Sequence, residues 1–269
     1  MRRNLFRLEE EMRFIFKLSS LAILFSFLFQ FSSSANSDDN KDFQNIDDSN
    51  LSASLKKQYL DDAARLAIMQ MNQDSTLKTE IFVPDSILLK YYGALIAVYN
   101  SNIKDTQIVN NIHDYRSSVI KEFSLGIDSS ASWVENLKNG NKITGINELD
   151  DLIATYNIEI NHVNIFSDKY YVSIQTEDYV NDAIFPNLFH GIDKIRNAER
   201  NGMGGDGGRI SASTNNESII LTYSTGWGDC RAGCASRHYW EFSVKRNEAR
   251  LIKEYGDSLP SNYKYGFFE

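Results

Sequence analysis

The C-terminal third of the chain carries the pattern that most limits its fold. Between Arg209 and Gly256, apolar and polar residues alternate in four short runs, "GRISAS", "SIILTYST", "HYWEFSV" and "ARLIKEYG". Alternation with a period of two is typical of half-buried β-strands. Turn-like "TNNE" and "KRNE" separate the first pair and the last pair of runs. The sequence therefore predicts that residues 201–269 form an antiparallel β-meander.

Residues 51–200 mix helical and strand patterns. Two helices are predicted from apolar residues at helical spacing, one in "LSASLKKQYLDDAARLAIMQMNQ" (51–73) and one after Pro84, which suits a first turn. Shorter helices are predicted in "SASWVENLKNG" and "INELDDLIATYN", and strands in "TQIVNNIHDY", "EFSLGID", "IEINHVNIF" and "YYVSIQT", the last two as a hairpin. Pro186 predicts a loop, followed by a helix that ends near Gly202. Together with the meander, these elements predict an α+β fold that packs as one domain.

The N-terminus has the three parts of a secretory signal peptide. Arg13 and Lys17 precede the apolar run "LSSLAILFSFLFQF", and small residues follow up to Ala35. The run is shorter than the roughly 20 residues of a membrane-spanning helix, so we expect export and removal of residues 1–35. The alternative is that residues 1–35 stay attached as a membrane anchor. We expect contact with a membrane only through this uncleaved segment. Acidic residues at positions 9–11 are unusual in such a segment, so Met1 and Met12 are alternative starts.

Residues 36–50 are polar and acidic without periodicity, which predicts a disordered leader. The whole chain is also acidic, with a net charge of −8 at pH 7. Removal of residues 1–35, which hold five basic and three acidic residues, would make that charge −10. Nucleic acid repels such a chain, and no basic stripe offsets the charge, so we exclude nucleic acid as a partner.

Both cysteines lie in "GWGDCRAGCASRHYW", Gly226–Trp240, which connects the second and third predicted strands. Because the surroundings of an exported chain are oxidising, we expect a disulfide between Cys230 and Cys234. It would close a small ring and stabilise the fold by only about 2 kcal/mol. The disulfide would therefore act as a clip on the meander.

The same stretch holds the residue types of other sites. Cys230, Cys234 and His238 are spaced four apart and, with Asp229, have the donors of a zinc site. Asp229, Ser236 and His238 are the types of a catalytic triad, and C-x-x-x-C allows thiol–disulfide exchange. However, the glycines disfavour a helix that would align the ligands, and the sequence has no G-x-S-x-G motif. We expect no metal and no cofactor, and Asp229, His238 and Ser236 stay as catalytic candidates of an alternative function.

The glycine-rich stretch "NGMGGDGGR", Asn201–Arg209, precedes the meander. Glycine-rich backbone can hold an anion, and Asp206 is a conceivable metal ligand. The stretch has neither the G-x-x-x-x-G-K-[ST] phosphate-binding motif nor a calcium-binding nonapeptide repeat. It is therefore predicted to be a mobile loop.

The pattern G-W-G-D-C-x-x-G-C-x-x-R-x-Y-W over Gly226–Trp240 resembles a signature of uncharacterised exported proteins of Bacteroidota-type bacteria. The upstream "WVENLKNGNKITGINELDDLIATYNI" is similar to the same group. The resemblance implies export and a shared fold. It implies no activity, so it assigns no functional residue.

These observations predict a secreted, periplasmic or cell-surface protein that binds a partner without catalysis. The binding candidates are Trp227, Asp229 and Arg231, because rigid loops on a scaffold often carry binding residues. The expected partner is a protein or a glycan at the cell envelope. The alternative is a secreted hydrolase or zinc-binding protein that uses Asp229 and His238.

Overall fold

The computed structural model describes residues 46–103, 106–202, 206–215 and 218–261. Contacts divide the chain into two compact units, Met1–Lys41 and Asp42–Glu269. The predicted signal peptide and most of the predicted leader lie outside the described residues, and every element below belongs to the second unit. Within the described ranges, no helix is both long and apolar enough to span a membrane.

Two long helices confirm the first two helix predictions. α2 spans Ala53–Gln73 and α3 spans Asp85–Tyr99. Ser52 caps α2, since its Oγ accepts a hydrogen bond from the backbone N–H of Leu55 at 3.2 Å. Pro84 precedes α3, where its fixed φ suits the start of a helix. The two helices pack against each other through their buried faces.

The first sheet has four antiparallel strands in the order β2-β3-β1-β4. They are β1 (Glu122–Asp128), β2 (Glu159–Phe166), β3 (Lys169–Gln175) and β4 (Ile195–Arg200). β2 and β3 form the predicted hairpin, and Ser167 in its turn has a φ of +58°. The predicted short helices are α5 (Val134–Lys138) and α6 (Asn147–Thr155). Their buried residues join those of the sheet in one hydrophobic cluster that includes Trp133, Leu149 and Val172.

The strand predicted over Thr106–Tyr115 is wrong. Its first residues form the short helix α4, Thr106–Val109. The backbone bonds of this segment are local, for example from Asn110 N to Thr106 O at 2.8 Å. Val109 and Ile112 are both buried, and they are three residues apart. Burial at that spacing favours a helical turn over a strand, whose successive side chains point to opposite faces.

The helix predicted before Gly202 is also wrong. The structure has a short 3₁₀ helix, η2 (Phe185–Phe189), and then strand β4. β4 pairs with β1, so that Leu125 lies opposite Ala198. β1 offers backbone hydrogen bonds at this edge, and such tertiary pairing overrides a weak local preference for helix.

The C-terminal meander is confirmed. Its strands pair antiparallel in sequence order and are β5 (Arg209–Thr214), β6 (Ile219–Trp227), β7 (Ser236–Lys245) and β8 (Glu248–Gly256). Between β7 and β8, Arg246 and Asn247 have φ values of +49° and +62°. Two consecutive positive φ angles are what a tight two-residue hairpin turn requires.

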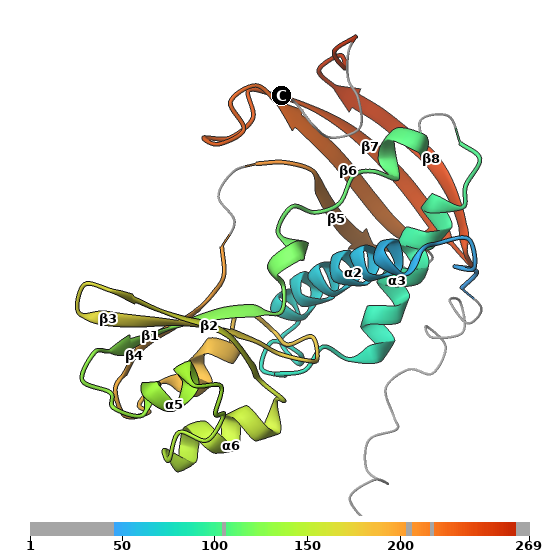
Figure 1. Cartoon of the computed structure of the whole chain (residues 1–269). Helices are drawn as coiled ribbons and strands as arrows, with labels where there is room; N and C mark the ends of the chain where they lie inside the picture. The colour runs from blue at the N-terminus through green and yellow to red at the C-terminus, as the bar shows by residue number, and fades with distance from the viewer. Residues whose placement is uncertain (1–45, 104–105, 203–205, 216–217, 262–269) are drawn as a thin grey trace, which may run out of the picture. The chain divides into compact units, whose positions relative to one another are not determined.

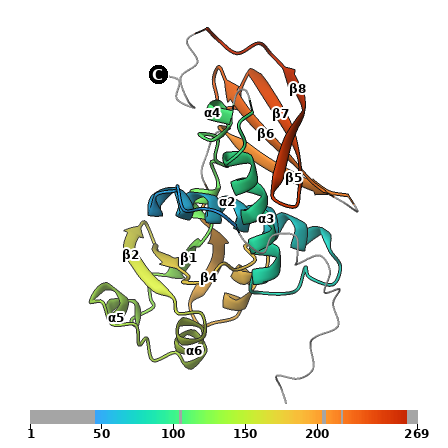
Figure 2. The ribbon, with the colours of Figure 1, turned by 90° about the vertical axis from the view of Figure 1, so that its right-hand side faces the viewer.

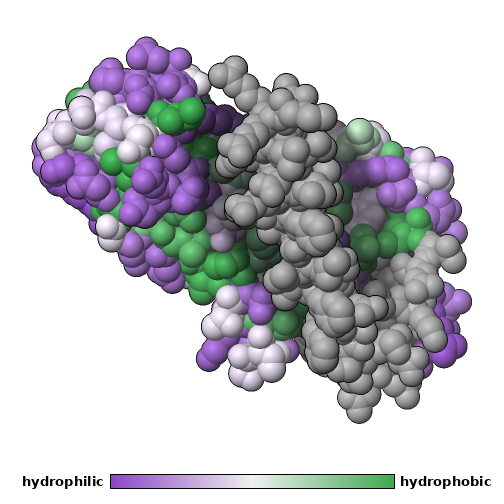
Figure 3. All heavy atoms as spheres, turned by 90° about the horizontal axis from the view of Figure 1, so that it is seen from below, coloured by the Kyte–Doolittle hydropathy of each residue, from purple (hydrophilic) through white to green (hydrophobic). Residues whose placement is uncertain are grey.

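One face of the meander is buried. Its inward side chains are those of Ile219, Leu221, Tyr223, Trp240, Phe242 and Val244. α3 contacts β6, β7 and β8, while α2 contacts β5, and Figures 1 and 2 show both helices beside this sheet. On the face drawn in Figure 3, polar residues make up most of the periphery and apolar residues gather between them. The α+β prediction, with N-terminal helices and a disulfide-clipped meander, is thus confirmed.

Candidate functional site

The connection between β6 and β7 is closed by the predicted disulfide. Cys230 and Cys234 are bonded, and their Cα atoms are 4.0 Å apart. Gly228, Asp229 and Gly233 have φ values of +74°, +46° and +111°, a region that glycine enters freely and aspartate tolerates. The local sequence therefore supplies the conformations that so short a loop needs.

The loop packs on the end of the sheet because Gly226 has no side chain. A Cβ at this position would lie 2.4 Å from Sγ of Cys234 and 2.9 Å from a guanidinium nitrogen of Arg237. Arg237 crosses above Gly226 and donates hydrogen bonds to Oγ of Ser224 at 2.9 Å and to Oδ1 of Asp206 at 2.5 Å. Gly226 is thus required by the close approach of two neighbouring side chains.

Asp206 ties the glycine-rich segment to the disulfide loop. It forms ion pairs with Arg237 at 2.5 Å and Arg209 at 2.7 Å, and it accepts a hydrogen bond from the backbone N–H of Cys234. Burial would raise the pKa of Asp206, but the hydrogen bond and charge of Arg237 outweigh it and lower that pKa below its usual value. The carboxylate of Asp206 is thus already paired with two arginine side chains. No group of three or more ligand side chains that could hold a metal ion occurs among the described residues.

The catalytic candidates of this stretch are not in hydrogen-bond contact with one another. His238 is buried against Trp240, with its ring centre 4.5 Å from that of the indole. Its Nδ1 lies 2.7 Å from the carbonyl oxygen of Asp257, and its Nε2 lies 3.1 Å from a carboxylate oxygen of Glu254. Both ring nitrogens therefore have structural partners. Ser236 is half-buried and Asp229 is exposed.

The three binding candidates differ in exposure. Asp229 and Arg231 are exposed on the disulfide loop, and Trp227, the last residue of β6, is half-buried. The loop therefore presents one acidic and one basic side chain to the solvent. A binding role for these residues stays a prediction.

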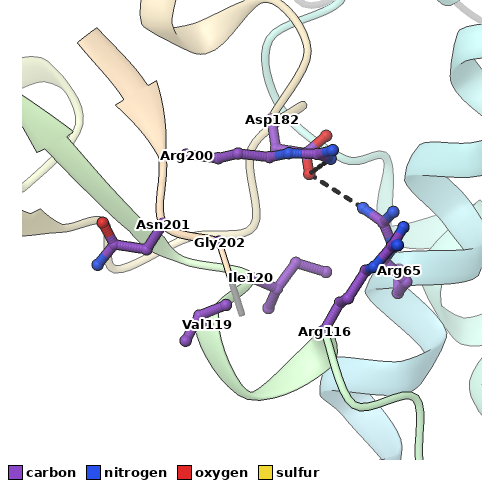
Figure 4. A pocket seen from close by; sticks show the side chains of 8 residues that line it. All are labelled: Arg65, Arg116, Val119, Ile120, Asp182, Arg200, Asn201 and Gly202. Carbon is purple, nitrogen blue, oxygen red and sulfur yellow. Dashed lines mark hydrogen bonds and ion pairs between the residues drawn. The ribbon is translucent and has the colours of Figure 1, made fainter. Parts of the chain in front are cut away.

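A second candidate site is a pocket that no sequence motif marks, formed by residues outside the disulfide loop. It has a volume of about 190 Å³, and three arginines line it: Arg65 from α2, Arg116 next to the 3₁₀ helix η1 (Ser117–Val119), and Arg200 from the end of β4. In Figure 4, the guanidinium groups of Arg65 and Arg200 converge on the carboxylate of Asp182, and the side chain of Arg116 rises toward the same region. Three separate segments thus place cations around one small space.

The pocket has an excess of positive charge. Oδ2 of Asp182 accepts hydrogen bonds from Arg65 at 3.0 Å and from Arg200 at 2.9 Å. The Asp182 side chain is only 6% exposed, so its charge is tightly held by these two arginines. Arg116 donates from Nε to the hydroxyl of Tyr115 at 2.8 Å and takes part in none of the ion pairs found between described residues. One carboxylate against three guanidinium groups leaves two net positive charges in a chain whose own net charge is −8.

No local signal could have located this pocket. Arg65, Arg116 and Arg200 are far apart in sequence and belong to no common motif. Their meeting depends on the pairing of β4 with β1 and on the position of η1 beside α2. The sequence predicted a helix where β4 lies, so Arg200 was expected in a helix and not at the end of a strand.

Comparisons with known proteins return no match: no family model, no curated protein and no solved structure corresponds to this chain.

Proposed function

We propose that this is an exported, non-catalytic binding protein whose arginine pocket receives an anionic group of its ligand. The observation that carries the proposal is the convergence of Arg65, Arg116 and Arg200 around a single carboxylate. Export rests on the signal-like N-terminal sequence, and the disulfide agrees with an oxidising compartment. The expected ligand is an acidic glycan or an acidic segment of a protein at the cell envelope.

Guanidinium groups suit this task. Arginine keeps its charge at all physiological pH values and offers planar, paired N–H donors that match carboxylate, sulfate and phosphate. Arg65 and Arg200 are already oriented by Asp182, so they lose little side-chain freedom when an anion binds. Among the described residues, Arg116 donates its side-chain hydrogen bond to the neutral hydroxyl of Tyr115, so no described residue neutralises its charge.

The size of the pocket limits what enters it. A volume of about 190 Å³ is below the roughly 300–1,000 Å³ of typical small-molecule sites. It therefore fits one anionic group of a larger ligand. The described lining holds no histidine, cysteine, serine or threonine, and its one carboxylate, Asp182, is held by Arg65 and Arg200. These features favour binding over catalysis.

Calorimetric titration with sulfate, phosphate and glucuronate tests the proposal. We expect at least one of these anions to bind, with an affinity that falls as sodium chloride is added, because salt screens the attraction. Arg116→Gln should weaken binding roughly ten-fold, the effect of losing one charge-assisted hydrogen bond. It should leave folding intact, because Arg116 is exposed and pairs with no described carboxylate.

The matched control is Lys142→Gln, which removes one positive charge from an exposed loop position outside the pocket. It should leave the affinity unchanged. The proposal fails if none of the three anions binds, or if both variants weaken binding equally, because the effect would then reflect net charge alone.

A further inference from the structure

A second and larger concavity has no charged side chain in its described lining. It is a groove of about 760 Å³ beside α2 and α4. None of its described lining residues is Asp, Glu, Lys or Arg, although such residues make up 24% of the chain. Four of them carry side-chain amides: Gln58, Gln107, Asn110 and Asn111. A groove whose described lining has no Asp, Glu, Lys or Arg and is rich in amides fits a neutral, polar ligand.

The aromatic and aliphatic residues of the groove further indicate the chemical class of its ligand. Tyr99 and Tyr115 add aromatic rings, and Leu55 and Ile112 add aliphatic surface. Each amide offers both hydrogen-bond donors and an acceptor, as a hydroxyl group does. A sugar ring has hydroxyls around its edge and C–H groups on its faces, which match amides and aromatic rings respectively. Peptide-binding grooves instead commonly anchor apolar or charged side chains, and the described lining has no Asp, Glu, Lys or Arg.

One wall of the groove holds an oriented histidine. Nδ1 of His113 lies 2.6 Å from Oδ2 of Asp62, whose side chain is fully buried. The other oxygen of Asp62 accepts a hydrogen bond from the backbone N–H of Asp114 at 2.9 Å. Burial raises the pKa of the Asp62 carboxyl, and the hydrogen bond and charge of His113 oppose that shift. The short contact therefore engages Nδ1 of His113 with Asp62 and fixes the orientation of the ring.

The consequence is an oriented ring nitrogen on the groove wall. With Nδ1 engaged by Asp62, Nε2 is the ring nitrogen of His113 left for a ligand, and an imidazole nitrogen can bond a hydroxyl as donor or as acceptor. The side chain of His113 is 22% exposed and belongs to the lining. The ring of Tyr59 packs edge-on against it, with the centroids 5.1 Å apart, and limits its rotation.

We propose that this groove binds a neutral oligosaccharide, with Nε2 of His113 forming a hydrogen bond with a ligand hydroxyl. Asp62 is a positioning residue, because it acts on the ligand only through His113. The inference is independent of the arginine pocket, since it rests on other residues and on a ligand without charge.

Binding to an array of neutral gluco-, xylo-, manno- and chito-oligosaccharides, followed by calorimetry with the strongest binder, tests the groove. We expect Gln107→Ala to weaken binding roughly ten-fold. The Gln107 side chain is exposed, so its loss should not affect folding. The matched control, Gln73→Ala, changes an exposed residue at the end of α2 outside the groove and should bind as the wild type does. Failure to bind any of these saccharides would overturn the proposal, as would equal affinities of the two variants.

The role of His113 has its own readout, the ¹⁵N chemical shifts of the imidazole nitrogens. The Nε2 signal, identified by its loss in His113→Phe, should shift when saccharide binds. Asp62→Asn should weaken binding because it removes the charged partner of Nδ1, and circular dichroism checks that this buried substitution leaves the fold intact. An Nε2 signal unmoved by bound saccharide would contradict the assigned role.

Discussion

Individual residues of the cysteine stretch, Gly226–Trp240, have identifiable structural roles. Gly226 leaves space for Cys234, and Gly233 adopts a φ of +111°. Arg237 bonds to Asp206, and Trp240 is fully buried in the core. The stretch from Gly226 to Trp240 therefore builds a compact loop and anchors it on the sheet.

Asp206→Asn should lower the free energy of unfolding at pH 7 by about 2 kcal/mol, the scale of a hydrogen bond to a charged group. Because the folded-state pKa of Asp206 is lowered, its contribution is present above the usual aspartate value of 3.8 and is lost as the pH falls below it. The difference between wild type and variant should therefore shrink in acid. Urea denaturation at several pH values between 7 and 2 measures this difference in the free energy of unfolding.

Asp229→Asn is the control for that experiment. Asp229 lies in the same loop but is exposed, and asparagine tolerates its positive φ equally well. It should change stability by less than about 0.5 kcal/mol. If both variants lose the same free energy, or if the Asp206→Asn difference persists unchanged in acid, the ion pair does not stabilise the loop.

At the scale of elements, local pattern predicted most of the structure. The meander, the β2–β3 hairpin and the helices α2, α3, α5 and α6 lie where periodicity and turn residues placed them. The two errors, α4 and β4, are short segments in which the local pattern was ambiguous. For β4 the deciding interaction is a hydrogen-bond ladder with β1, which lies about 70 residues earlier in the chain.

Replacing Cys230 and Cys234 together by serine should cost about 2 kcal/mol of unfolding free energy, because the closed loop is small. The sheet should persist, since β6 and β7 pair from Ile219–Val244 to Trp227–Ser236 without the disulfide. Urea denaturation measures the loss of unfolding free energy, and far-UV circular dichroism measures whether the sheet persists. Reduced wild-type protein is the control and should match the variant. Loss of the folded state in the double variant would show that the disulfide directs the register of the strands.

The whole described unit has two hydrophobic clusters linked by polar contacts. One contains α2, α3 and the meander, and the other contains the first sheet with α5 and α6. Between their elements, Asp182 bonds to Arg65 of α2, and the hydroxyl of Tyr179 donates to Asp61 at 2.7 Å. The isolated bridge between Phe82 and Val180 adds a backbone link. The arginine pocket lies at these links, so its geometry depends on how both clusters pack.

Asp182→Ala should destabilise the protein by about 3 kcal/mol, because Arg65, only 12% exposed, would face Arg200 without a counter-charge. Added sulfate should raise the unfolding free energy of this variant more than that of wild type, since an anion can replace the lost carboxylate. Asp168→Ala, at a 66% exposed position paired with Arg196, is the control and should change little. An unchanged unfolding free energy in Asp182→Ala would contradict the linking role, and equal stabilisation of all three proteins by sulfate would contradict anion binding in the pocket.

Sequence patterns sufficed for the fold class, the meander, the disulfide and the acidic character of the chain, because these depend on periodicity, composition and residues close together in the chain. Neither the arginine pocket nor the pair of Asp62 and His113 could be found in this way. Their residues come from segments about 50 to 130 positions apart and share no motif. Helix packing and strand pairing bring these residues together, and burial then determines how strongly the charges of the bonded pairs interact.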